Sequence, residues 1–332
     1  MSYWKVLDAR YLDRPLDLDA VFGRTAPFTL EIGFGRGDHL IHLGKKLPDY
    51  NIIGIEISQP SLRKASGKVK NNSLTNVRVV DGSGPMLLWT NIAPQTIEQL
   101  HVNFPDPWHK EGHQHRRLIN PEFLHLAATR MKEGALLFVA TDHPDYQPVV
   151  TDCLEKTPYF DSRLDSTYTL SEPDRFTTKY EQKALREGRV PFYYKFVRNA
   201  QPAPNTFIIP EELPVPHAIV QLPLSFTDMH QKFEPFEERT SDGVINASFK
   251  EAFVAANFPT FLIETYIRQD PQDQRIGLII HEREPNEFIV KMHTMGFPRT
   301  TDGVHYAVGR LANWLASLHE DGRIVHHNLQ RF

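Results

Sequence analysis

The sequence predicts an α/β protein, built on a mostly parallel sheet and followed by a smaller α+β region. Short apolar segments alternate with amphipathic ones, as strands and helices do in such sheets. The first apolar segment, residues 29–32, runs into a glycine-rich loop and then into an amphipathic segment with leucines at helical spacing that stops at Pro48. Residues 135–140 form a continuous apolar run, which is typical of a central strand buried on both faces.

Three glycines at alternate positions, Gly33, Gly35 and Gly37, follow the first strand. Without a Cβ, the backbone there can approach a ligand closely. The spacing differs from the G-x-G-x-x-G fingerprint of NAD-binding proteins. An acid, Glu31, stands two residues before the first glycine, where it would repel a pyrophosphate but suit a cationic amino-acid group.

A second acid, Glu56, lies near the end of the next apolar segment, residues 51–57, about 20 residues beyond the glycines, where acids accept hydrogen bonds from ribose hydroxyls. Ribose with a cationic amino-acid tail and no phosphates describes S-adenosylmethionine. A generic turn that holds some other nucleotide is the alternative.

A stiffened acid follows a later strand. Residues 97–104 alternate apolar and polar side chains and predict a strand. Asp106 comes directly after it, between Pro105 and Pro107, which remove two backbone donors. Sites in open parallel sheets form at the carboxyl ends of strands, so Asp106 is a candidate catalytic residue. A turn-capping acid, with Trp108 packed as a lid, is the alternative.

Two further strand ends carry polar groups, and two loops are basic. Residues 77–81 predict a strand, which is followed by Gly82-Ser83-Gly84. Polar groups at this point either contact an adenine or form an ordinary turn, and both alternatives stay open. Thr141 and Asp142 end the buried strand 135–140. The basic run 110–117 is expected to contact phosphate because it follows Asp106, although a solvated surface is the alternative. Residues 158–199 predict two strands, 160–168 and 191–198, joined by a basic loop that grips RNA or is an ordinary connection.

Composition describes a globular protein of 332 residues that is 40% hydrophobic, with a net charge of −4. Residues 1–199 carry 26 Lys and Arg against 24 Asp and Glu, whereas residues 200–332 carry 11 against 17. An RNA-facing surface is therefore expected in the first part. The single cysteine, Cys153, excludes an internal disulfide and a CxxC metal site. With neither a signal-peptide core nor a membrane-length apolar stretch in the sequence, we expect a soluble cytoplasmic protein.

A proline-rich boundary divides the chain. Prolines crowd residues 200–216 and predict a stiff linker between a first domain, 1–199, and an extension, 217–332. Strands are predicted in the extension at 218–226, 260–268, 275–283 and 288–295, and a helix from Thr301 and Asp302. Its eight histidines are scattered, so core or surface roles are favoured and no metal is expected. The extension is expected to pack on the first domain or to form a homodimer contact.

Four motifs in residues 25–198 carry a resemblance. They are E-I-G-F-G-R-G at 31–37, G-I-E-I at 54–57, F-P-D-P-W-H-K at 104–110 with the basic run behind it, and R-F-T-T-K-Y-E at 175–181. Together they resemble the bacterial tRNA (guanine-N7-)-methyltransferase family, class I enzymes that methylate a guanine in the tRNA variable loop. The glycine loop is common among methyltransferases, whereas the F-P-D-P-W block with its basic run is far more specific.

The resemblance implies a class I methyltransferase fold, which is a Rossmann-like, mostly parallel sheet whose last strand is antiparallel. It implies S-adenosylmethionine as the methyl donor, tRNA as the partner and guanine 46 as the target. Asp106 is implied as the catalytic acid. The implied cofactor-binding residues are Glu31, Gly33, Gly35, Gly37, Glu56, Ser83 and Asp106. The implied substrate-binding residues are Lys110, His113, Arg116, Arg117, Asp142, Thr178, Lys179, Tyr180 and Glu181.

Two positions depart from the family pattern. The family usually has an acid where this chain has Ser83, so either Ser83 or Asp81 is expected to contact the adenine. It usually has Arg where this chain has Gly112, which is expected to weaken one phosphate contact.

Two other functions stay open at the level of sequence. A nicotinamide-dependent oxidoreductase is opposed by Glu31 and by the glycine spacing. A non-catalytic RNA-binding protein with a methyltransferase-like core is supported by Ser83 and Gly112 and opposed by the intact Asp106.

Overall fold

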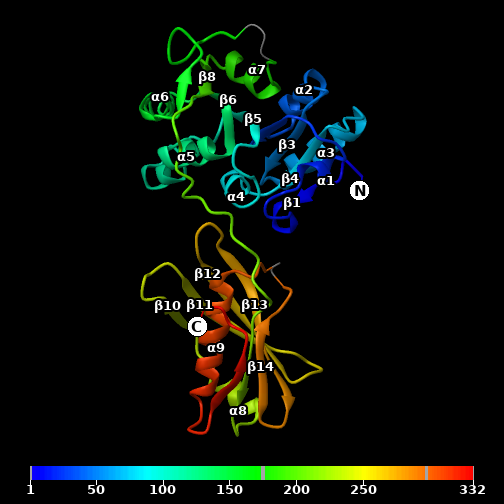
Figure 1. The fold of residues 1–332 in the computed structure, drawn as a ribbon, viewed down its shortest axis with the longest axis vertical. Coiled ribbons are helices and arrows are strands. Elements are labelled where there is room, and N and C mark those ends of the chain that lie inside the picture. Colours follow the sequence, from blue (N-terminus) through cyan, green and yellow to red (C-terminus); the bar gives the residue numbers. More distant parts are fainter. Residues whose placement is uncertain (1, 173–175, 296–297, 332) are drawn as a thin grey trace. The chain divides into compact units, whose positions relative to one another are not determined.

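The structure is a computed structural model that describes residues 2–172, 176–295 and 298–331. The chain divides into two compact units, Met1–Ile209 and Pro210–Phe332 (Figure 1). Arg175 of the fourth motif lies outside the described residues. No helix in the described ranges combines the length and the apolar content that crossing a membrane requires.

The first unit is built on a sheet of eight described strands in the order β1-β4-β3-β2-β5-β6-β8-β7. From β1 to β6 neighbouring strands run parallel, whereas β8 is antiparallel to β6 and β7 is antiparallel to β8. The predicted α/β class with a mostly parallel sheet is confirmed. The strands are β1 (Leu7–Asp8), β2 (Phe28–Ile32), β3 (Asn51–Glu56), β4 (Val77–Asp81), β5 (Ile97–Asn103), β6 (Met131–Thr141), β7 (Phe160–Ser162) and β8 (Phe192–Arg198).

Helices flank this sheet (Figure 1). Side chains alternate across a strand, so Ile52 and Ile53 of β3 enter different apolar clusters. Ile52 packs with residues of α2 and α3, whereas Ile53 shares its cluster with residues of α4, α5 and α6. The helices are α1 (Leu18–Phe22), α2 (Asp38–Lys46), α3 (Gln59–Asn71), α4 (Gly84–Thr90), α5 (Pro121–Arg130), α6 (Gln147–Lys156) and α7 (Lys179–Arg186), with 3-10 turns η1 (Ala9–Tyr11) and η2 (Glu111–Arg116).

Part of the proline-rich segment packs on the first unit. The side chain of Phe207 is buried against Trp89 and His125. The fully buried Arg130 donates to the Phe207 carbonyl at 2.6 Å and to Asn205 Oδ1 at 3.0 Å. Burial lowers the pKa of Arg130 to about 10. The chain is therefore held to this unit as far as about residue 208, beyond the boundary at 199 that composition suggests.

The second unit is a sheet of seven described strands in the order β10-β11-β12-β13-β14-β9-β15, with all neighbours antiparallel. Helix α9 (Asp302–Ala316) packs on it through a buried stripe that includes Val304, Val308, Leu311 and Leu315. The predicted helix and four predicted strands are confirmed, although three strands were missed. The remaining elements are β9 (His217–Gln221), α8 (Phe226–Gln231), β10 (Phe236–Arg239), β11 (Asn246–Val254), β12 (Thr260–Arg268), β13 (Gln274–Glu284), β14 (Glu287–Met292) and β15 (Arg323–His327).

A buried histidine joins the two ends of this second unit. His305 of α9 is 0% exposed, and its Nε2 lies 2.9 Å from the Pro214 carbonyl. Its Nδ1 accepts a hydrogen bond from the backbone N–H of Gln330 at 3.0 Å. Nδ1 therefore carries no proton, and the ring is neutral in the folded protein. Burial lowers the pKa of His305, while Pro214 and Asp302 act in the opposite direction.

We expect the second unit to lose stability as the pH falls below about 6.5, the ordinary pKa of histidine. Below that value the unfolded chain binds a proton at His305 that the folded chain does not, so the slope approaches about 1.4 kcal/mol per pH unit until the folded pKa is reached. Hydrogen-exchange protection of α9 amides at pH 7.5, 6 and 5 measures this. His305→Gln is the comparison, since other histidines also titrate. Equal slopes in the two proteins would contradict the assignment.

Candidate active site

The glycine loop turns the chain from β2 into α2. Gly33, Gly35 and Gly37 all have positive φ, at 71°, 54° and 76°. A Cβ on Gly37 would lie 2.7 Å from Cβ of Ala65, so space as well as backbone conformation requires glycine there. The backbone N–H of Gly35 donates to Oε2 of Glu56 at 3.0 Å. The loop is thus tied to the end of the neighbouring strand β3.

Glu31 is the central charged group of the cavity beside this loop. It is 1% exposed, and its Oε1 lies 3.1 Å from Nδ1 of His39 and 3.5 Å from Nδ2 of Asn103. Its Oε2 is buried and receives no hydrogen bond from the described residues. An ionised carboxylate oxygen left unsatisfied in a buried place is costly, and a bound cationic donor would remove that cost.

The cavity has a volume of about 220 Å³ and lies at the carboxyl ends of β2 and β5. Of the sequence-predicted site residues, Glu31, Gly33, Gly35, Thr178 and Tyr180 line it. His39, Asn103 and Phe104 also line it and were not predicted. Its described lining is completed by Phe34, Arg36, Asp38 and Ser61.

Several predicted cofactor residues do not line this cavity. Glu56 is joined to it through Gly35, and the other oxygen of Glu56 accepts from Ile57 and Ser58 at 2.9 Å and 3.0 Å. Gly37 does not line the cavity either, but its backbone N–H donates to the Phe34 carbonyl at 2.9 Å within the loop. Neither Ser83 nor Asp81 is among the described residues that line the cavity; Ser83 is the N-cap of α4, and Asp81 accepts from the Gln59 amide at 2.5 Å. Asp106 is exposed and lies beyond Phe104.

The Asp106 loop is held in an unusual backbone conformation. Phe104 and Trp108 have positive φ, at 51° and 43°, although neither is glycine. Such outliers cost free energy and persist where the surroundings fix them, often at functional sites. Arg117 fixes this loop by donating from Nε to the Pro107 carbonyl at 2.8 Å. The loop thus presents an exposed carboxylate at Asp106 on a stiff support.

The basic run divides into an exposed part and a buried part. Lys110 and Arg116 are exposed and His113 is half-buried, and the Arg116 guanidinium lies 5.2 Å from the Trp108 ring centroid. Arg117, which the resemblance implies as a tRNA contact, belongs to the buried part. It is 8% exposed, and its guanidinium lies 5.3 Å from the ring centroid of Tyr146. Its position suits support of the Asp106 loop better than contact with a phosphate.

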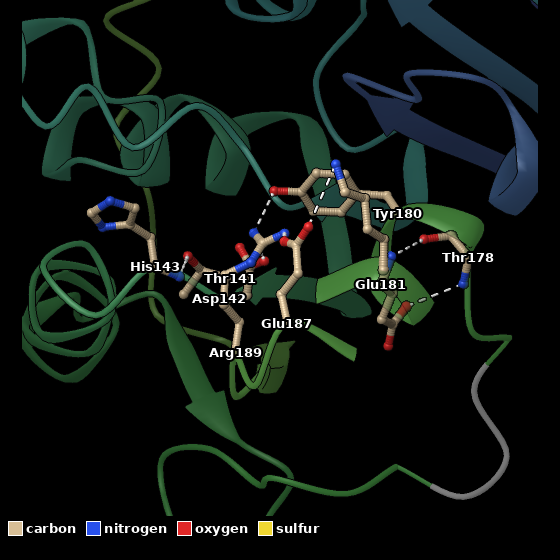
Figure 2. Close-up of polar contacts among 9 residues, drawn as sticks. Thr141, Asp142, His143, Thr178, Tyr180, Glu181, Glu187 and Arg189 are labelled. Carbon is tan, nitrogen blue, oxygen red and sulfur yellow. Dashed lines mark hydrogen bonds and ion pairs between the residues drawn. The ribbon is translucent and has the colours of Figure 1, made fainter. Parts of the chain in front are cut away.

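The segment after Thr177 forms helix α7, whereas its charged sequence predicts a loop. Thr178 and Glu181 form a capping box, in which each side chain accepts from the other residue's backbone N–H, at 3.2 Å and 3.3 Å (Figure 2). Glu181 is 1% exposed and also accepts from the Tyr193 hydroxyl. Tyr180 is exposed on one side. The side chain of Lys179 lies outside what the structure describes.

Asp142 lies at the end of β6, opposite α7. It is 7% exposed and forms an ion pair with Arg189, which is not among the predicted site residues (Figure 2). Arg189 also donates to the Tyr180 hydroxyl at 3.1 Å, and this hydrogen bond is the main reason that the pKa of Arg189 is raised. The site thus has two parts. One is the cavity lined by Glu31 and the glycine loop, called here the donor cavity because it is where a methyl donor would bind. The other is the carboxylate of Asp142, which is connected to Tyr180 through Arg189. Among the described residues, no three His, Cys, Asp or Glu side chains gather as they would around a metal ion.

This sheet order, with a glycine loop after the central strand and acids at neighbouring strand ends, defines a class I methyltransferase. Comparison with known proteins agrees, since the family model described as "Putative methyltransferase" matches residues 25–193. The chain is 31% identical over 314 residues to a protein of Thermus thermophilus named tRNA (guanine-N(7)-)-methyltransferase, and the match covers 93% of this chain and 96% of that protein. A protein of the same name from Pseudomonas syringae is 36% identical over 185 residues, which cover 55% of this chain and 76% of that protein. The chain belongs to the tRNA (guanine-N7-)-methyltransferase family.

Proposed function

We propose that this protein transfers the methyl group of S-adenosylmethionine to N7 of a guanine in the variable loop of tRNA, at position 46. The observation that carries the proposal is the buried Oε2 of Glu31, which is unsatisfied among the described residues and lies beside a glycine loop. The names of the relatives supply the acceptor. Because the proposed substrate is tRNA, the proposed localisation is the cytoplasm.

The residues around the cavity fit this donor. Glu31 would hold the ammonium group of the amino-acid tail, and the backbone at Gly33 and Gly35 would lie against the ligand. An ionised carboxylate offers about four acceptor positions. The Glu56 carboxylate already accepts three hydrogen bonds, from the backbone N–H groups of Gly35, Ile57 and Ser58. One acceptor position is left for a ribose hydroxyl. When bound, S-adenosylmethionine supplies an electrophilic methyl group on a sulfonium.

The acceptor needs little acid–base chemistry, because guanine N7 has a free lone pair in the plane of the base. The protein's contribution is therefore position and electrostatics. Methylation at N7 leaves the purine positively charged. Asp106 would stabilise that developing charge, while Asp142 would accept hydrogen bonds from the base. Thr178 and Tyr180 line the donor cavity, and Tyr180 is connected to Asp142 through Arg189. Lys110, His113 and Arg116 would contact phosphates, which positions the tRNA without reading its sequence.

The proposal is tested with the purified chain, an unmodified tRNA transcript and methyl-labelled S-adenosylmethionine. We expect label in tRNA, strand cleavage at residue 46 by chemistry specific for 7-methylguanine, and loss of both signals when guanine 46 is replaced by adenine. Calorimetric titration should show binding of S-adenosylmethionine and none of NAD. Tight tRNA binding without transfer would instead favour a non-catalytic RNA-binding protein.

A further inference from the structure

The chain reverses direction after helix α7, which places Arg189 against Asp142. Gly188 has a positive φ of 75°, and its N–H donates to the Leu185 carbonyl at 3.1 Å. The next N–H, that of Arg189, donates to the Ala184 carbonyl at 3.0 Å. This pair of bonds is the Schellman arrangement, in which a left-handed residue reverses the chain after a helix. The reversal brings Arg189 beside Tyr180 of the first turn of α7 (Figure 2).

Arg189 joins three side chains from two elements. Its guanidinium pairs with Oδ2 of Asp142 after β6, donates to the Tyr180 hydroxyl at 3.1 Å and donates to Oε2 of Glu187 at 2.9 Å. It also lies 5.3 Å from the centroid of the Tyr180 ring. The side chain is 34% exposed, so it is held by these contacts more than by packing. A planar guanidinium with five donors can fix several acceptors in one geometry, which an ammonium group cannot do as well.

These contacts leave one side of Asp142 available. The ion pair occupies Oδ2, and no hydrogen bond from the described part of the chain reaches Oδ1. Tyr180, the other main partner, lines the donor cavity and lies 5.5 Å from Phe104, ring centroid to ring centroid. Arg189 therefore links the Asp142 carboxylate, on the side where the base would bind, to Tyr180, which lines the donor cavity.

We infer that Arg189 is the positioning residue of the acceptor side, which holds Asp142 so that Oδ1 meets the base at a fixed distance from the donor. The inference rests on the proposed function. Guanine presents hydrogen-bond donors at N1 and at its exocyclic amine, whereas adenine presents an acceptor at N1. A carboxylate oxygen held in place accepts from guanine and repels adenine, so Arg189 contributes to the choice of base through Asp142.

The experiment compares Arg189→Ala with Arg186→Ala in the tRNA methylation assay. Arg186 is an exposed cation in the last turn of α7, three residues before Arg189, and its described hydrogen bond is to the Gln182 carbonyl, so its loss removes an equal charge without touching Asp142. We expect Arg189→Ala to lower kcat/KM for tRNA by about 10- to 100-fold, as misplacement of a recognition group does, and Arg186→Ala by about twofold or less. Arg189→Lys should restore part of the loss. Thermal unfolding and donor affinity report whether the variants are folded.

A double-mutant cycle with Asp142→Asn separates positioning from direct contact with RNA. If Arg189 acts through Asp142, Arg189→Ala should cost little more in the Asp142→Asn background. The inference is overturned if the two substitutions reduce kcat/KM independently, so that their fold-losses multiply in the double variant. It is also overturned if Arg189→Ala and Arg186→Ala have equal effects. In either case an active wild type supports the proposed function. A wild type that transfers no methyl group to tRNA would overturn both.

Discussion

Replacing Glu31 with glutamine is expected to weaken binding of S-adenosylmethionine by about 100-fold while leaving the fold intact. The buried carboxylate is the proposed partner of the donor's ammonium group, and losing one member of a buried charge pair costs about 2–5 kcal/mol. Each 1.4 kcal/mol is about a factor of ten in affinity. Glutamine keeps the shape of the side chain and an oxygen that can face His39, so the packing of β2 should not change. Titration calorimetry measures the affinity.

The same substitution should not destabilise the protein when no donor is bound. The wild type then holds a buried carboxylate oxygen that the described residues leave without a hydrogen bond, and a neutral amide is cheaper to bury than an ion. A ligand-side control is 5′-methylthioadenosine, which has the adenosine but lacks the amino-acid tail. Its affinity should be nearly equal in the two proteins. A parallel loss for both ligands would show that Glu31 shapes the cavity and does not select the ammonium group.

The parts of the site that could be predicted from sequence depend on local rules. Alternate glycines after a strand require positive φ and permit close approach, so Gly33 and Gly35 were found from their spacing. The carboxyl ends of parallel strands meet at one edge, and Glu31 and Asn103 lie close together for that reason although 72 positions separate them; Asn103 was nevertheless not among the predicted site residues. The same rule did not reveal that Asp106, on a loop beyond the strand, would lie outside the donor cavity.

The parts that could not be predicted depend on tertiary contacts. Arg117 belongs to a run of cations, and only the folded chain shows that a Pro107 carbonyl and the Tyr146 ring bury it. Arg189 looked like one more charge in a polar loop. That loop did carry one local signal that was missed, the T-x-x-E capping box of Thr178 and Glu181, which marks the start of a helix.

One unpredicted strand of the second unit, β15, has a similar explanation. Most side chains of β15 are exposed, so its sequence lacks the alternation of apolar and polar residues that reveals a half-buried strand. It pairs with β9 at the edge of the sheet, and that pairing is a property of the whole unit.

Replacing Asp106 with asparagine is expected to lower kcat for tRNA methylation by about 100- to 1000-fold, with the affinity for S-adenosylmethionine changed by about threefold or less. Asp106 is exposed in the free protein and does not line the donor cavity, so neither folding nor donor binding should depend on its charge. Bound tRNA would exclude water from the loop, and a charge about 4 Å from the purine would then be worth about 4 kcal/mol at an effective dielectric constant of 20. The loss matches what removal of one group that stabilises transition-state charge commonly costs.

Single-turnover kinetics distinguish this role from simple recognition of the base. A group that binds substrate and transition state equally raises KM without changing kcat, whereas a group that acts on the developing charge lowers kcat. Asp145→Asn is the matched control, because Asp145 is an exposed acid on the loop after β6 and its loss changes the net charge equally. A higher KM with kcat preserved in Asp106→Asn would assign Asp106 to binding of the guanine. The stabilising charge would then have to come from Asp142, whose ion pair with Arg189 already offsets part of its field.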